Sequence, residues 1–160
     1  TDFFKTGTYD MKREFYTTIS PSMDILESSN FERFLYYVSG EDYEATNSRM
    51  KDLKQNGSLS VTAEELQRIQ KDFSGQFVSD EETKAVIAQV YNSYGYLLDP
   101  HTAVAMGAYM KELQAHPEDG GRHTVIAATA HPFKFPIRFA KPWKFRPAIR
   151  HMKALSTSVR

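Results

Sequence analysis

Cysteine is absent from the 160-residue sequence, which excludes disulfides, thiolate metal sites and cysteine nucleophiles and favours a cytoplasmic protein. No apolar run approaches the roughly 20 residues that cross a bilayer, so no membrane partner is expected. Residues 1–5 contain neither an initiating methionine nor an apolar signal segment, so we expect the chain to begin inside a longer protein. What is present, 41% hydrophobic and 25% charged residues, is ordinary for a globular protein.

Charge is balanced overall but not along the chain. Residues 120–160 contain nine Lys or Arg and no Asp or Glu, which leaves 11 basic and 20 acidic residues before them, a net charge of −9. Beyond residue 132, aromatic residues alternate with basic ones, a combination that binds single-stranded nucleic acid. One alternative is therefore a non-catalytic helical module with a basic nucleic-acid-binding arm.

Most of the chain is predicted to be helical. Thr62 and Ser79 are each followed three residues later by Glu, the capping-box pattern of a helix start. Asp99 precedes a proline, and together they predict another start, because the carboxylate caps and proline suits the first helical position. Asn30 is predicted to cap a helix as well. The expected helices cover residues 31–38, 42–55, about 63–73, 80–94 and 100–114.

Strand signals are scarce. Residues 124–129 (TVIAAT) are short and apolar without alternation, as in a strand buried on both faces of a parallel sheet. A weaker candidate covers residues 16–19. One buried strand cannot form a sheet alone, so its neighbours are expected in a missing segment or another chain.

Five segments in order carry a family resemblance. They read FFKTGTY at 3–9, SPSMDI at 20–25, SSNFER at 28–33, LDPHTAV at 98–104 and ATAHPFKFP at 128–136. Together they resemble the C-terminal part of threonine synthase over residues 1–136. The resemblance implies a fold type II α/β enzyme, of which this chain is a helix-rich fragment with one or two sheet strands. Residues 30–94 look like the helical insertion of the longer family members.

The resemblance also implies an activity. Threonine synthases are pyridoxal-phosphate (PLP) lyases that convert O-phosphohomoserine and water into threonine and phosphate, with the cofactor as electron sink. The cofactor lysine and the glycine-rich phosphate loop of the family lie upstream of the matched stretch. We therefore expect no catalytic residue here, and no activity from the chain without the remainder of the enzyme. A threonine synthase-like phospholyase with a related phosphorylated substrate is a second alternative.

Four residues are candidates for binding. Thr129 matches the family position that contacts the pyridine nitrogen of PLP; otherwise it is a strand-end residue bonded to local backbone. His101, Arg33 and Asn30 are candidates for substrate binding, Arg33 because a guanidinium matches phosphate and carboxylate. The structural alternatives are a satisfied histidine at a helix start, a helix cap at Asn30, and pairing of Arg33 with a nearby carboxylate. The five histidines show no metal-site spacing, so no metal is expected.

Residues 137–160 depart from the family pattern. They contain seven basic residues and no acidic ones, where the family leads us to expect an amphipathic helix of mixed charge. We interpret this tail as non-homologous and do not expect nucleic acid as a partner.

Overall fold

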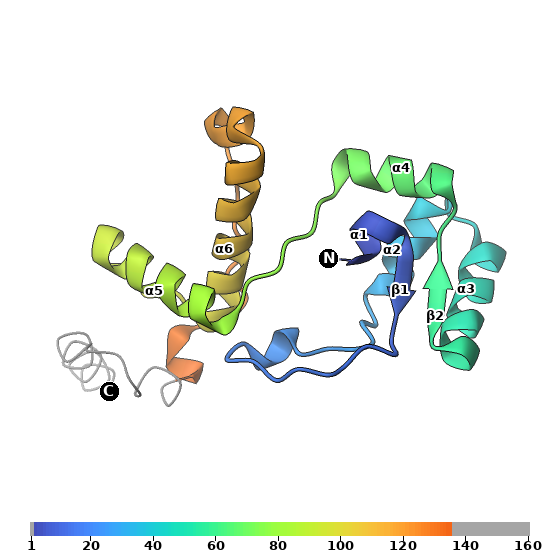
Figure 1. Ribbon diagram of the computed structural model, residues 1–160, viewed down its shortest axis with the longest axis horizontal. Coiled ribbons are helices and arrows are strands. Elements are labelled where there is room, and N and C mark those ends of the chain that lie inside the picture. The colour runs from blue at the N-terminus through green and yellow to red at the C-terminus, as the bar shows by residue number, and fades with distance from the viewer. Residues whose placement is uncertain (1, 136–160) are drawn as a thin grey trace, which may run out of the picture.

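The computed structural model describes residues 2–135, so the basic tail and the arm of the nucleic-acid alternative lie outside the described residues. Helices dominate, with one small sheet (Figure 1). In chain order the elements are α1 (Asp2–Thr6), β1 (Thr8–Asp10), η1 (Pro21–Met23), α2 (Phe31–Val38), α3 (Tyr43–Asn56), β2 (Ser58–Ser60), α4 (Ala63–Asp72), α5 (Asp80–Tyr94), α6 (Pro100–Ala115), η2 (Pro117–Gly121) and η3 (Pro132–Lys134).

The five predicted helices are confirmed as α2 to α6. Both capping boxes form: the Thr62 and Ser79 side chains accept hydrogen bonds from the N–H groups of Glu65 and Glu82, which reach back to the cap backbone. Left-handed glycines close two helices, Gly57 after α3 (φ 72°) and Gly95 after α5 (φ 67°). These ends match the prediction because capping depends on residues within one turn.

Asn30 differs from its predicted role. Its backbone is helical (φ −75°, ψ −19°), and its side chain makes no cap hydrogen bond. A side-chain cap requires extended backbone at the cap residue, so Asn30 is already too far into the turn. Its Oδ1 accepts a hydrogen bond from Arg33 Nη2 at 2.5 Å instead.

Neither predicted strand is formed among residues 2–135. The sheet consists of β1 and β2, antiparallel, with Tyr9 opposite Leu59, and neither three-residue segment is long enough to show a strand pattern in the sequence. Residues 16–19 and 124–129 have no strand partner among residues 2–135, and Val125 is 92% exposed. A strand requires a neighbour for its N–H and C=O groups, and the described residues provide none beside either segment.

One hydrophobic cluster is rich in aromatic residues. The rings of Phe3 and Phe31 meet edge to face at 4.8 Å, and Tyr9 stacks on Phe31 at 4.5 Å. The Tyr9 hydroxyl donates to the carbonyl of Leu26 at 2.6 Å and so ties the following loop to the cluster. The buried members come from α1 to α4 and β2: Phe3, Leu35, Leu53, Leu59 and Ile69. We call residues 2–10 and 31–72 the aromatic lobe.

A second cluster joins α5 to α6. Its buried members are Val86, Ile87, Val90, Leu98 and Ala103. Gly107 of α6 permits the close approach, because a Cβ there would lie 3.0 Å from Cγ1 of Val78 and 3.4 Å from Cγ2 of Val86. We call residues 80–115 the helical hairpin. Residues 11–30 and 73–79 connect it to the aromatic lobe (Figure 1).

Candidate functional site

Buried polar side chains gather where α6 begins. Ser20, Asp99, His101 and Thr102 are between 2% and 5% exposed. Buried polar groups cost free energy unless they are hydrogen-bonded, so their partners define what this region does. We call these residues, with the turn at residues 18–24, the junction.

Asp99 makes the most hydrogen bonds of the buried residues in the junction. Its Oδ1 accepts hydrogen bonds from the N–H of His101 (2.9 Å) and of Thr102 (3.4 Å), and its Oδ2 accepts one from the Thr102 hydroxyl. Burial acts to raise the pKa of Asp99, but the bonds from Thr102 and His101 outweigh it and hold the pKa below its ordinary value. Asp99 is therefore an anchored carboxylate that caps α6.

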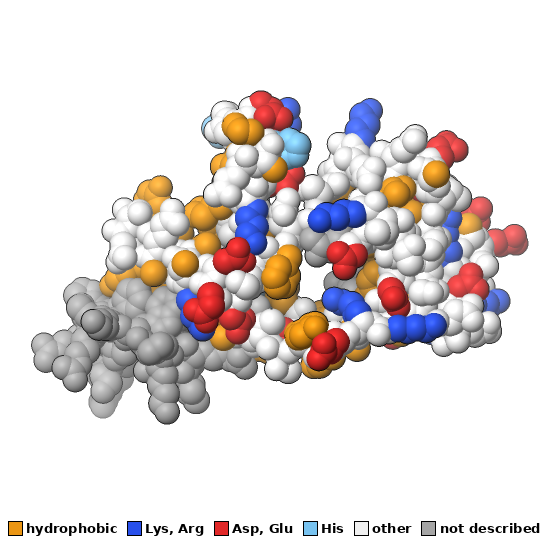
Figure 2. All heavy atoms as spheres, in the orientation of Figure 1, with side chains coloured by type: hydrophobic (Ala, Val, Ile, Leu, Met, Phe, Trp, Pro, Cys, Tyr) orange, Lys and Arg blue, Asp and Glu red, His pale blue; other side chains and the backbone are white. Residues whose placement is uncertain are grey.

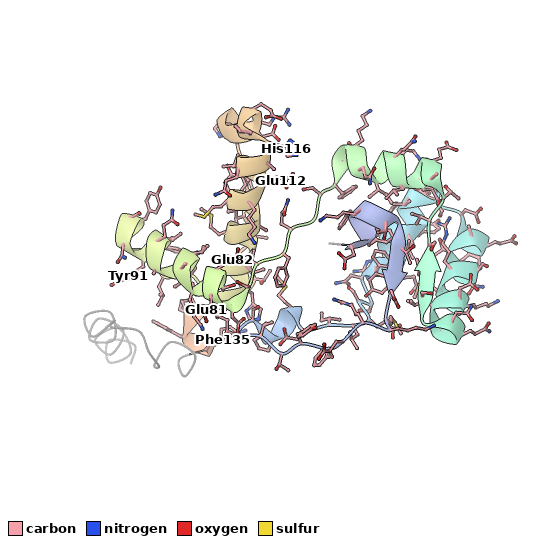
Figure 3. The ribbon with its side chains drawn as sticks, in the orientation of Figure 1. Glu81, Glu82, Tyr91, Glu112, His116 and Phe135 are labelled. Atoms are coloured by element: carbon pink, nitrogen blue, oxygen red, sulfur yellow. The ribbon has the colours of Figure 1, made fainter. Side chains whose placement is uncertain are left out.

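His101 connects α6 to a distant turn. Its Nδ1 lies 3.0 Å from Oδ1 of Asp99, and its Nε2 accepts a hydrogen bond at 3.1 Å from the N–H of Ser22. Its ring also lies 4.8 Å from that of Phe135, which Figure 3 shows near the base of the hairpin. Both ring nitrogens are thus engaged, so the substrate contact expected for His101 has no free ring nitrogen.

The turn at residues 18–24 is held by acidic side chains as well. The Thr18 N–H and hydroxyl donate to the two carboxylate oxygens of Asp24 at 2.8 and 2.7 Å. The N–H of Ile19 donates to Oδ1 of Asp80 at 3.1 Å, which joins the turn to the start of α5. The turn is therefore tied to both helices of the hairpin.

Ion pairing joins the two helices beyond the junction. Glu82 Oε1 lies 2.7 Å from Nζ of Lys111, and Lys111 also donates to the carbonyl of Phe77 at 2.5 Å. The bond from Lys111, together with the capping bond from Ser79, lowers the pKa of Glu82 to about 2. Figure 3 labels Glu82 near the start of α5 and Glu112 towards the end of α6, where Glu112 accepts a hydrogen bond from Gln76 at 2.8 Å.

A cavity of about 310 Å³ lies beside the turn. The turn contributes Ser20, Met23 and Asp24 to its wall, and α6 contributes Val104. The remainder of the wall comes from residues 13–16, 18, 25, 26 and 76–78. Its lining combines apolar side chains with Arg13 and with the carboxylates of Glu14 and Asp24.

The other predicted site residues lie apart from the junction. Asn30 and Arg33 bind each other at the exposed start of α2. Among residues 2–135, Arg33 has no carboxylate partner, so the expected pairing with a nearby acid is not formed. Thr129 is exposed in the unpaired segment and makes no hydrogen bond within the described part of the chain.

Sequence reasoning missed two contacts that organise the junction. It treated Asp99 only as a cap and did not foresee that the same carboxylate orients His101. An Asp at the cap with a His two residues later is the local signal for this contact, because the cap oxygen and the ring meet over the first turn. The contact between Asp80 and Ile19 gives no such signal, since 61 residues separate the two.

Residues 2–135 contain no group of three or more His, Cys, Asp or Glu side chains that could hold a metal ion. Within the same range, no helix is long and apolar enough to cross a membrane.

The sequence is similar to those of threonine synthases from several organisms. The chain is 39% identical over 146 residues to threonine synthase of Saccharomyces cerevisiae, an alignment that covers 83% of the chain and 28% of the yeast protein. The chain is homologous to threonine synthase over most of its length. It is also 38% identical over 136 residues to threonine synthase-like 1 of Homo sapiens, covering 84% of the chain and 18% of the human protein. No protein-family profile matches the chain.

Solved structures agree with the sequence relatives. The crystal structure of yeast threonine synthase matches with a TM-score of 0.80 at 33% identity, over 98% of the chain and 35% of the yeast structure. PLP-bound threonine synthase from Brucella melitensis matches with a TM-score of 0.71 at 37% identity, over 86% of the chain and 28% of that structure. The expected fold class is confirmed: the chain is helix-rich with a two-stranded sheet and matches part of the threonine synthase structure.

Proposed function

We propose that the chain is one segment of a PLP-dependent threonine synthase, a lyase that converts O-phosphohomoserine and water into threonine and phosphate. The observation that carries this proposal is the meeting of two family segments, 20–25 and 98–104, through the bond from the Ser22 N–H to His101. Homology to threonine synthase over 83% of the chain supports it. A cytoplasmic location and a helical insertion at about residues 30–94 belong to the same proposal.

PLP would find one candidate partner among the described residues. The Thr129 hydroxyl is exposed and unpaired within residues 2–135, so it is free to hydrogen-bond the pyridine nitrogen. When bound, PLP supplies the electron sink for carbanion chemistry. We assign no chemical step to the described residues themselves.

Asn30 and Arg33 are proposed to bind the phosphate or carboxylate of the substrate. The bond from Arg33 Nη2 to Oδ1 of Asn30 holds the guanidinium in a fixed orientation at the start of α2. A guanidinium has five N–H donors, and those not used by Asn30 remain available. Preorganised charge of this kind recognises anions at a lower entropic cost.

The remainder of the enzyme is the proposed partner of this segment. Residues 124–129 are mostly apolar, mostly exposed and paired with no strand within residues 2–135, the state expected of a strand whose neighbours belong to another part of the protein. The purified 160-residue chain is therefore expected neither to gain visible absorbance with PLP nor to release phosphate from O-phosphohomoserine. Turnover by the chain alone would contradict the proposal.

A chimera tests the proposal directly. Residues 1–136 replace the matching segment of yeast threonine synthase, and phosphate release and growth of a threonine auxotroph are measured. We expect activity in both assays. A folded chimera that binds PLP but fails in both would overturn the assignment to threonine synthesis.

A related phospholyase activity is the second candidate. The observation in its favour is the 38% identity to human threonine synthase-like 1. The same chimera separates the two candidates when O-phosphohomoserine is compared with other phosphorylated amino alcohols and hydroxy amino acids. A preference for one of the latter would favour the phospholyase.

A further inference from the structure

We infer that His101 is a positioning residue, which fixes the turn at Pro21–Met23 to the start of α6 through the backbone N–H of Ser22. This inference rests on the proposed function, because the effect of His101 on activity is measured as threonine synthase activity. The turn contributes to the cavity described above. It assigns His101 an indirect role instead of a contact with the substrate.

The tautomer of His101 follows from its two partners. A backbone N–H can only donate, so Nε2, 3.1 Å from Ser22 N, must be the unprotonated acceptor. The proton therefore resides on Nδ1, which donates to Oδ1 of Asp99 at 3.0 Å. This assignment is inferred from hydrogen bonding. One neutral tautomer satisfies both contacts at once.

Asp99 makes this arrangement rigid. The carboxylate accepts from two backbone N–H groups and the Thr102 hydroxyl besides the His101 ring. Asp99 and His101 are 2% and 4% exposed, so water does not readily replace a lost partner. Asp99 therefore orients the His101 ring, and the His101 ring in turn holds the backbone of the turn at Ser22.

Residues 18–24 also form part of the wall of the neighbouring cavity. Ser20, Met23 and Asp24 flank or follow Ser22 and line the cavity of about 310 Å³, whereas His101 does not. Val104, three residues after His101 on α6, also lines the cavity. A change at His101 is therefore transmitted to the cavity through the turn, which is 79 residues away in sequence.

A direct substrate role for His101 conflicts with this geometry. To reach a ligand, the ring would have to give up its hydrogen bond with the Ser22 N–H or with the buried carboxylate of Asp99. His101 is itself only 4% exposed, so a ligand would also have to displace the groups that cover the ring. The positioning role requires no such rearrangement.

Nitrogen NMR of the 160-residue chain tests the geometry without any need for activity. We expect a proton on Nδ1 of His101, none on Nε2, and a coupling across the hydrogen bond between the Ser22 amide and Nε2. A proton on Nε2 at neutral pH would overturn the inference.

Two substitutions in the chimera test the role. H101Q places a carbonyl oxygen near the former Nε2 and can still accept from Ser22, whereas H101N can reach Asp99 but not Ser22. We expect H101N to lower kcat/KM up to about 10-fold, the scale of one hydrogen bond whose donor residue stays accessible to water. H101Q should restore most of the loss. H116Q and H116N, at a half-exposed histidine at the end of α6, are the matched controls.

The outcomes separate the two proposals. Equal losses for H101Q and H101N would overturn the positioning role, as would full activity of H101N. An unsubstituted chimera without threonine synthase activity would instead contradict the proposed function, while the NMR measurement still decides whether His101 holds Ser22.

Discussion

The aromatic lobe and the helical hairpin are held together differently. In the lobe, Phe3, Tyr9, Phe31 and Phe34 pack as edge-to-face or stacked rings around buried aliphatic residues. In the hairpin, the buried cluster is aliphatic, and a network centred on Asp99 lies at its base. Aromatic burial contributes stability, whereas buried hydrogen bonds contribute little net stability but penalise other arrangements. The packing of the lobe thus contributes mainly to stability, whereas the hydrogen bonds of the junction determine how its segments are arranged.

Surface composition extends this contrast. Large hydrophobic side chains are exposed between the two regions, including Phe15 and Phe77, and on the last turn of α5 at Tyr94. Figure 2 shows hydrophobic side chains exposed over the hairpin and between it and the lobe. Exposed apolar groups of this kind mark interaction sites when they form a patch. They fit the proposal that the hairpin packs against the remainder of an enzyme.

Truncating the lobe core should have the largest effect. Leu35 is fully buried, and Leu35→Ala should destabilise the protein by about 3 kcal/mol because it removes apolar contacts and leaves a cavity. Urea denaturation measures the loss, and hydrogen exchange locates it. We expect faster exchange in α2 to α4 and little change in α5 and α6. Ile87→Ala, the matched change in the hairpin, should show the reverse; identical exchange patterns would mean that the two regions unfold as one.

Asp99→Asn should have the next largest effect, about 2 kcal/mol at neutral pH, because it replaces one accepting oxygen by an NH2 group and removes the charge that strengthens the bonds from His101 and Thr102. The folded-state pKa of Asp99 is below its ordinary value of 3.8. Its contribution is therefore complete above pH 3.8 and is lost as the pH falls through the folded-state pKa. The stability of D99N should accordingly depend less on pH in acid. A parallel pH dependence in both proteins would contradict this.

Replacing either of the two capping glycines by alanine should lower the stability less than Asp99→Asn does, and by similar amounts. Gly57→Ala in the lobe and Gly95→Ala in the hairpin both place a side chain at positive φ, at a cost of about 1 kcal/mol. Gly57→Ala should be the slightly worse of the two, because the new Cβ would lie 3.0 Å from Cε of Lys12, whereas nothing lies within 4 Å at Gly95. Thermal melts compare them, with Gly120→Ala as a control that has neither constraint. A neutral Gly95→Ala would show that the end of the hairpin is not fixed.

Lys111→Met should change stability least. Because Glu82 is exposed, solvent screens its pair with Lys111. The pKa of Glu82 should nevertheless rise from about 2 towards 4.5 when its largest stabilising partner is removed. The contribution of Glu82 is present above pH 4.5 and is lost as the pH falls towards 2. Carboxylate titration by NMR measures the shift; an unchanged value would mean that the Ser79 cap alone sets it.

Local signals were sufficient for the helices and insufficient for the site. Thr62, Ser79 and Asp99 mark helix starts because a cap acts on N–H groups two or three residues away. Asn30 has the right chemistry for a cap, yet its helical backbone excludes that role. For the candidate site, the sequence indicated His101 but not that its ring nitrogens would be engaged by Asp99 and Ser22.

The sequence by itself determined where α2 to α6 begin and end, since these boundaries depend on hydrogen bonds within one turn. Only the tertiary structure decided which distant segments meet. Pairing of Tyr9 with Leu59, and of Ser22 with His101, requires the chain to bring groups 50 and 79 residues apart into register. Residues 124–129 also depend on a distant segment. Their composition favours a strand, but no strand forms there among residues 2–135 because its hydrogen bonds need a neighbouring strand.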